Sequence, residues 1–173
     1  KGQILYQGQL TREIAHKTNQ LVVVEGYMDV ISLAEFGISN AVAPLGTALT
    51  EGQIRELWKF STEPIICFDG DSAGMRAAAR ASDRLLPMLE PGFSARFASL
   101  PPGEDPDDIV RRGGANNFRE LLETSTGLSD FFWETEKSNG SLDTPEKQAA
   151  FFKRIRKRVG EIKNQTVREA YND

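Results

Sequence analysis

The sequence is poor in the residues that form covalent cross-links and most transition-metal sites. Its 173 residues include one cysteine, Cys67, and one histidine, His16. A single cysteine cannot form an internal disulfide, and these two residues are too few for a zinc site of Cys and His ligands. We therefore expect no zinc, and we expect any bound metal to be held by oxygen atoms.

Long hydrophobic runs are also missing. No apolar stretch approaches the roughly 20 residues that a membrane-spanning helix needs, and the N-terminus lacks the basic-then-apolar pattern of a signal peptide. We therefore predict no membrane partner and a cytoplasmic location. Because the sequence starts at Lys1 without a methionine, within an apparently structured phrase, we interpret it as a piece of a longer protein.

The composition is that of a folded domain. There is no Gly/Ser tract and no repeat, and apolar residues make up 39% of the chain against 27% charged residues, which disfavours disorder. The net charge of −4 argues against a surface that coats nucleic acid in general, but it says little about one local groove.

Short apolar segments alternate with helical patterns along the first two thirds of the chain. Predicted strands at residues 21–24, 40–45, 64–68 and 94–100 precede predicted helices at 27–36, 50–60, 75–89 and 107–112. Repeated βα units indicate an open, mostly parallel sheet with helices on its faces. Only helical patterns follow Ala115, so we predict an α/β domain at residues 1–114 and a helical subdomain at 115–173.

Acidic residues follow three of the four predicted strands. In open parallel sheets, ligands bind at the carboxyl ends of the strands, because the loops converge there. The acids expected at this edge are Glu25, Asp29, Asp69, Asp71, Asp105 and Asp107. Neighbouring carboxylates repel one another unless cations neutralise them, and oxygen ligands suit Mg²⁺ or Mn²⁺. The sequence therefore predicts a divalent-metal site.

Helix capping is the alternative interpretation of each acid taken alone. Carboxylates favour the first turn of a helix, and acidic Gly-rich turns are common. For Asp107 and Asp108, which follow Pro106, both interpretations stay open. The repetition of acids at successive strand ends is what favours a shared site.

The same segments resemble a known family in their order and spacing. They are similar to the TOPRIM core of DnaG-type bacterial primases in the stretches LVVVEGYMDV, AVAPLGTALT, IICFDGDSAGMRAA and FASLPPGEDPDDIV. The resemblance implies a TOPRIM-like, mostly parallel sheet flanked by helices. The later helices fit the small C-terminal helical bundle that closes the primase polymerase region.

The resemblance also implies roles for individual residues. Glu25 matches the family's glutamate, taken as a general acid/base or a metal ligand, and Asp29 matches the acid one turn later. The DxD metal ligands and the last acidic pair of the family are matched by Asp69, Asp71, Asp105 and Asp107. Of the full set, Glu25, Asp69 and Asp71 are the expected catalytic residues.

The resemblance implies metal-dependent nucleotidyl transfer. The expected reaction joins ribonucleoside triphosphates on a single-stranded DNA template into a short RNA primer for replication. In the family a zinc-binding domain and a basic subdomain belong to the same protein, so the isolated piece is expected to be weakly active or inactive. The family's helicase-binding domain is also expected outside this chain. Lys1 and Arg76 are candidate phosphate contacts, although a solvated helix face is the alternative for Arg76.

Two other classes of function remain open. A TOPRIM nuclease or topoisomerase would use the same acids to break phosphodiesters, although none of the three tyrosines lies in a recognisable nucleophile context. A non-catalytic Mg²⁺-binding docking module is the second class, although such a module has no need of acids at three strand ends.

Overall fold

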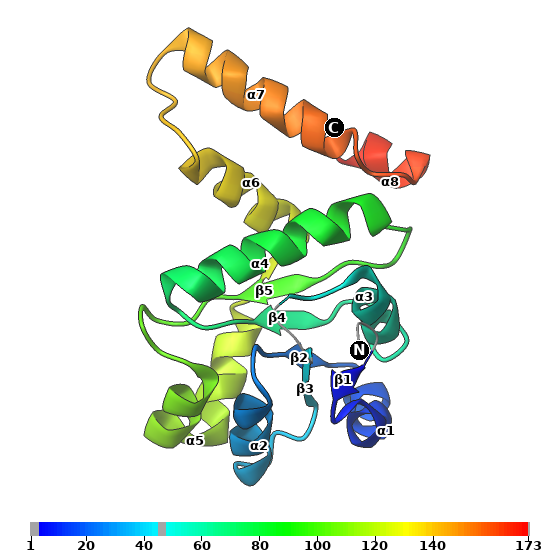
Figure 1. Ribbon diagram of the computed structural model, residues 1–173, viewed down its shortest axis with the longest axis vertical. Helices are drawn as coiled ribbons and strands as arrows, with labels where there is room; N and C mark the ends of the chain where they lie inside the picture. Colours follow the sequence, from blue (N-terminus) through cyan, green and yellow to red (C-terminus); the bar gives the residue numbers. More distant parts are fainter. Residues whose placement is uncertain (1–3, 45–47, 173) are drawn as a thin grey trace.

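The computed structural model describes residues 4–44 and 48–172, which form a six-stranded sheet covered by helices (Figure 1). Its strands are β1 (Leu5–Tyr6), β2 (Val22–Val23), β3 (Ala41–Pro44), β4 (Ile65–Cys67), β5 (Arg96–Ala98) and β6 (Thr126–Gly127). Their order across the sheet is β1-β3-β2-β4-β5-β6. The four central strands are parallel and the two edge strands are antiparallel. The mostly parallel sheet predicted from the sequence is confirmed, whereas the two edge strands were not predicted.

Eight α-helices accompany the sheet in the described part of the chain. They are α1 (Gly8–Thr18), α2 (Tyr27–Glu35), α3 (Glu51–Trp58), α4 (Ser72–Leu85), α5 (Pro106–Glu123), α6 (Leu128–Ser138), α7 (Pro145–Val159) and α8 (Gln165–Ala170), and a short 3-10 helix, η1 (Leu86–Met88), follows α4. Among these helices, none is long and apolar enough to cross a membrane.

Adjacent residues of the central strands face opposite layers of the core. Val23 and Ile66 pack in a cluster with residues of α3 and α4, whereas Val22 and Ile65 pack in a second cluster with residues of α2 and α5. Both faces of these strands are therefore buried. This arrangement explains why the strands read as continuous apolar runs and not as alternating ones.

Helix α5 consists of two helical segments. The first matches the short helix predicted at residues 107–112, and the backbone leaves the helical conformation at Gly114, where φ is 71° and ψ is −177°. Phe118 and Leu122, which follow Gly114, are buried in the cluster that contains α2. A positive φ is readily adopted by glycine, so the helix is interrupted at the residue where the boundary was predicted, and the second segment packs with the α/β region.

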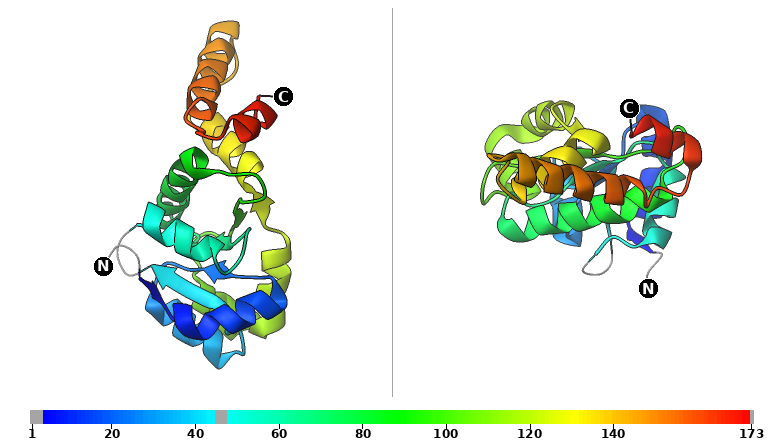
Figure 2. Two further views of the ribbon diagram at one scale, coloured as in Figure 1. Left: turned by 90° about the vertical axis from the view of Figure 1, so that its right-hand side faces the viewer. Right: turned by 90° about the horizontal axis from the view of Figure 1, so that it is seen from above.

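The C-terminal helices pack onto α4, and α7 lies outermost (Figures 1 and 2). Phe132 of α6 and Val159 of α7 share a cluster with Leu85 of α4. Arg158 of α7 pairs with Asp83 of α4 at 2.6 Å and with Glu136 of α6 at 3.5 Å. The helical region is thus tied to the α/β region by apolar and ionic contacts, and the division at residues 1–114 and 115–173 stays a prediction.

Candidate active site

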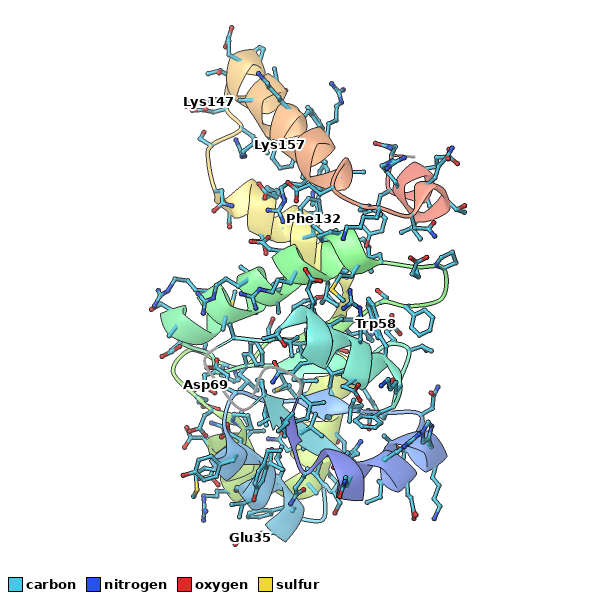
Figure 3. The ribbon with its side chains drawn as sticks, turned by 45° about the vertical axis from the view of Figure 1, so that its right-hand side comes forward. Glu35, Trp58, Asp69, Phe132, Lys147 and Lys157 are labelled. Atoms are coloured by element: carbon cyan, nitrogen blue, oxygen red, sulfur yellow. The ribbon has the colours of Figure 1, made fainter. Side chains whose placement is uncertain are left out.

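Strands β2 and β4 lie side by side, and the order in which the strands are added to the sheet reverses between them. From β2 the chain passes through α2 to β3 on one side, and from β4 it passes through α4 to β5 on the other. Open parallel sheets bind ligands at the carboxyl ends of strands beside such a switch point. Glu25 closely follows β2 and Asp69 closely follows β4, so both lie at this edge; Figure 3 labels Asp69.

Glu25 and Asp69 are in direct contact. Oε1 of Glu25 accepts a hydrogen bond from the backbone N–H of Asp69 at 3.3 Å. Oδ1 of Asp69 is buried and has no hydrogen-bond partner among the described residues. Burial, and then the charges of Glu25 and Asp29, raise the pKa of Asp69 to about 7. A bound cation would satisfy this oxygen and stabilise its ionised form.

Asp29 lies one turn beyond Glu25, in the first turn of α2. Its Oδ2 accepts a hydrogen bond from the Gly26 N–H at 3.0 Å. Burial first, and then the charges of Asp105, Glu25 and Asp107, raise the pKa of Asp29 to about 6, against the lowering effect of the Gly26 hydrogen bond. Glu25 and Asp107 are 82 residues apart in the sequence, yet both raise the pKa of the same carboxyl group. This is expected for a shared site.

Asp71 and Asp105 both cap helices. Oδ1 of Asp71 accepts hydrogen bonds from the N–H groups of Ala73 at 2.8 Å and Gly74 at 2.7 Å, at the start of α4. Oδ1 of Asp105 accepts one from the Asp108 N–H at 2.8 Å, at the start of α5. The capping interpretation is confirmed for these two acids. It leaves each with a second carboxylate oxygen, so it is compatible with metal binding.

Asp107 is engaged by side chains of the protein itself. Each of its carboxylate oxygens lies 2.7 Å from Nε of Arg111, and Oδ1 also accepts a hydrogen bond from the Ser32 hydroxyl. These contacts, the Arg111 hydrogen bond first, lower the pKa of Asp107. A cation at Asp107 would compete with Arg111. The sequence analysis missed Arg111, although its i,i+4 spacing from Asp107 is typical of a helical ion pair.

Backbone contacts hold the turn of Asp69 and Asp71 against the loop that precedes α5. The Gly70 N–H donates to the Glu104 carbonyl at 2.8 Å, and the Gly103 N–H donates to the Gly70 carbonyl at 3.1 Å. A Cβ atom on residue 70 would lie 2.0 Å from the carbonyl oxygen of Pro101. The close approach of the two acidic loops therefore requires glycine at this position.

Not all of the predicted site residues are brought together. Within residues 4–44 and 48–172, no group of three or more His, Cys, Asp or Glu side chains has an arrangement that could hold a metal ion. The metal-ligand set therefore stays a prediction. Lys1 lies outside the described residues. Arg76 is exposed and lines a hollow with Asp130 and Phe131 of α6, away from the cavity that Glu25 lines.

Comparison with protein families assigns the sheet and its acidic edge. A family model described as Toprim-like matches residues 22–110, which include all six predicted acids. The chain belongs to the Toprim-like family. Toprim domains generally bind divalent metal ions, so the expectation of a divalent-metal site agrees with the family.

A second family model covers the C-terminal helices of this Toprim-like chain. It is described as the DnaB-helicase binding domain of primase, and it matches residues 129–172. We had expected helicase binding to depend on a domain outside the chain. The match corrects that expectation, because a segment of this family lies within the chain.

Similar curated proteins are named DNA primase. The protein of Rickettsia bellii is 36% identical over 171 residues, which are 99% of this Toprim-like chain and 28% of the relative. The protein of Escherichia coli K12 is 38% identical over 168 residues, which are 97% of this chain and 29% of the relative. The chain thus spans less than a third of the length of these relatives.

Solved structures confirm the predicted fold and the resemblance to the DnaG-type catalytic core. A structure described as the DnaG primase catalytic domain bound to ssDNA matches this Toprim-like chain with a TM-score of 0.89 at 36% identity, covering 99% of this chain and 55% of that one. A DNA primase domain from Pseudomonas aeruginosa matches with a TM-score of 0.91 at 38% identity, covering 98% and 53%.

Proposed function

We propose that the chain is the metal-binding part of a cytoplasmic DNA primase, which joins ribonucleoside triphosphates on single-stranded DNA into short RNA primers. The observation that carries the proposal is a Toprim-like sheet with acids after β2, β4 and β5, in a chain 36% to 38% identical to DNA primases along nearly its whole length. The related catalytic domain that binds ssDNA adds support for the template.

The residues present fit Mg²⁺ or Mn²⁺. All candidate ligands are carboxylates, which these hard cations prefer. The partnerless Oδ1 of Asp69 and the raised pKa values of Asp69 and Asp29 mark a place where positive charge is favourable. Glu25, Asp69 and Asp71 are the proposed catalytic ligands, and Asp29, Asp105 and Asp107 are proposed to support them.

In this proposal the chain supplies positioning and charge. Bound divalent ions would favour ionisation of the primer 3′-hydroxyl and offset the charge of the triphosphate. Asp71 is fixed by the N–H groups of α4, and Glu25 by the N–H of Asp69. The N-termini of α4 and α5 start beside these acids, and their helix dipoles favour bound phosphate.

Primer synthesis by the longer protein that contains this chain tests the proposal. Asp69→Ala should abolish Mg²⁺-dependent RNA primers on a single-stranded template, because the reaction needs the ions that this side chain helps to hold. Glu123→Ala, an exposed acid at the end of α5, is the control and should be fully active. Nicking of supercoiled DNA with Mg²⁺ and no ribonucleotides would instead favour the nuclease.

We further infer that residues 129–172 contact the replicative helicase, on the support of the family match. Trp133 of α6 and Phe152 of α7 are 40% and 45% exposed, and both rings lie against Phe151. Exposed aromatic side chains of this kind are enriched at interfaces. Replacing Trp133 and Phe152 by Ser should weaken helicase binding in a pull-down while primer synthesis persists; undiminished helicase binding would contradict this inference.

A further inference from the structure

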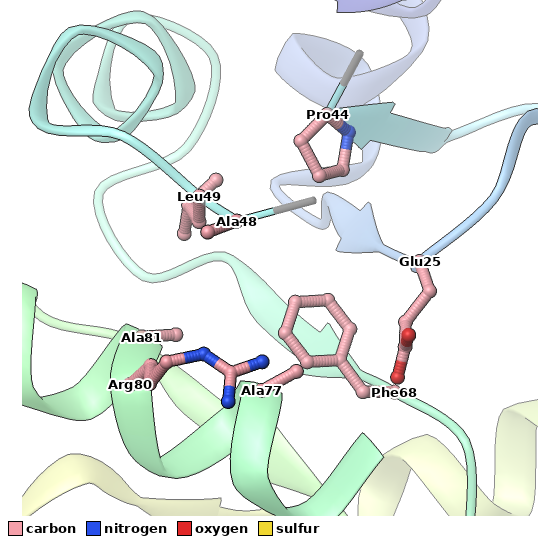
Figure 4. Close-up of a pocket in the computed structure, with 8 residues that line it drawn as sticks. All are labelled: Glu25, Pro44, Ala48, Leu49, Phe68, Ala77, Arg80 and Ala81. Carbon is pink, nitrogen blue, oxygen red and sulfur yellow. The ribbon is translucent and has the colours of Figure 1, made fainter. Parts of the chain in front are cut away.

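A cavity of about 70 Å³ lies beside Glu25, on the α4 side of the sheet (Figure 4). Part of its wall is apolar and is formed by Pro44, Leu49 and Phe68. Its charged lining residues are Glu25 and Arg80. Figure 4 shows the Arg80 guanidinium extending from α4 toward the Phe68 ring, with the Glu25 carboxylate on the other side of that ring in this view.

Arg80 differs from the arginines one turn before and one turn after it on α4. Arg84 donates a hydrogen bond to the Leu49 carbonyl at 2.5 Å, and Arg76 lines a hollow toward α6. Arg80 is exposed and, like Arg76, makes no hydrogen bond and no ion pair with any residue in the described part of the chain. Its five donors are therefore available to a ligand.

Among the described residues that line the cavity, no salt bridge forms. Glu25 accepts its hydrogen bond from the Asp69 backbone and forms no ion pair with Arg80. Arg80, which has no ion-pair partner in residues 4–44 and 48–172, therefore lines the same small cavity as a residue of the proposed metal site. This arrangement favours a negatively charged ligand. One end of such a ligand would bind the metal ions proposed beside Glu25, and the other end would bind the Arg80 guanidinium.

We propose that Arg80 binds a phosphate group of the ribonucleoside triphosphate substrate. The planar guanidinium matches two phosphate oxygens at once. The size of the cavity suits one small group, whereas a nucleic-acid backbone would need an extended groove. Phosphate oxygens also complete the coordination of Mg²⁺ held by carboxylates, so a triphosphate would link the metal site to Arg80. This inference rests on the proposed function.

Equilibrium binding of ATP to this chain in the presence of Mg²⁺ tests the role of Arg80. Arg80→Ala should weaken binding about tenfold or more, as expected for the loss of a charge-assisted hydrogen bond. Arg80→Lys should fall in between, because lysine keeps the charge but lacks the planar fork. Arg119→Ala removes an exposed arginine of α5; it is the control and should bind like the unaltered chain. Thermal unfolding of each variant checks that it is folded.

The same titrations with a single-stranded oligodeoxynucleotide identify the source of the phosphate. If Arg80→Ala weakens oligonucleotide binding but not ATP binding, the residue contacts a nucleic-acid backbone and the proposal is overturned. If both ligands bind unchanged, the role of Arg80 is overturned while the proposed primase function stands. If the unaltered chain itself does not bind ATP with Mg²⁺, the triphosphate site proposed for this chain is overturned, whereas the proposed function is decided by primer synthesis in the longer protein.

Discussion

Asp69 is a carboxyl group whose ionisation is unfavourable in the metal-free folded chain. Burial and the nearby acids raise its pKa from an ordinary value of 3.8 to about 7. Between about pH 4 and pH 7 the folded chain keeps a proton that the unfolded chain has lost. The contribution of Asp69 to stability is therefore greatest at low pH and declines as the pH rises to 7.

Asp69→Asn should remove this pH dependence. In EDTA, the unaltered chain should lose stability between pH 4.5 and pH 8, because it must ionise the buried carboxyl, whereas the variant has no such group. The free energy of unfolding of the variant minus that of the unaltered chain should therefore increase over this range. Adding Mg²⁺ at pH 8 should stabilise the unaltered chain more than the variant. Urea unfolding measures both effects, with Glu123→Gln as control; a stability difference that does not change with pH would contradict the account.

Asp71 has a structural role as well as a proposed catalytic one. Asp71→Ala removes the cap of α4 and should lower the free energy of unfolding by about 0.5–2 kcal/mol. Asp71→Ser keeps a capping oxygen and should cost less, yet both variants should lose most primer synthesis in the longer protein, since neither offers a carboxylate. Retained primer synthesis in Asp71→Ser would show that the residue serves only as a cap.

At the scale of the elements, local patterns were predicted well and distant contacts were not. A helix was predicted at residues 50–60, and the structure shows α3 there, with the Gln53 N–H donating to Thr50 Oγ1 at 3.2 Å. The second segment of α5, after Gly114, buries Phe118 and Leu122 in the cluster that contains α2, a contact that no local pattern reveals. The edge strands β1 and β6 are two residues each, too short for a periodic pattern.

In the candidate site, too, features set by local sequence were predicted and contacts between distant segments were not. Glu25 and Asp69 were predictable because each closely follows an apolar strand, and parallel strands bring their carboxyl ends together. The contact of Asp107 with Ser32 could not be predicted, because it joins α5 to α2 and its two residues are 75 positions apart in the sequence. The shift of the start of α4 to Ser72 follows from the cap by Asp71, which the sequence analysis had weighed only as an alternative.

The turn between β4 and α4 should be intolerant of a side chain at Gly70. Gly70→Ala forces the two acidic loops apart, because its Cβ would overlap the Pro101 carbonyl, and it should cost about 1–3 kcal/mol of unfolding free energy. Gly140→Ala is the control, since its Cβ would meet nothing within 4 Å. Equal stability of the two variants by urea unfolding would contradict the close approach of the loops.

At the scale of the whole molecule, the chain has more acidic than basic residues. Its net charge is −4, and backbone neutralisation by basic groups supplies much of the affinity for single-stranded DNA. We expect the isolated chain to bind metal and nucleotide weakly and to make primers poorly. Incubation with template, ribonucleotides and Mg²⁺, beside the longer protein, measures this; efficient primers from the isolated chain would show that its own surface binds the template.

The position of bound metal tests the central claim most directly. Crystals of this chain soaked in Mn²⁺ should show anomalous difference density between Asp69 and Asp71, with Glu25 beside it, because these carboxylates share the edge formed by β2 and β4. Asp69→Asn crystals soaked in the same way should lose that density. Density only at other places in the molecule, or none at this edge, would contradict the assignment of the acidic strand ends as the metal site.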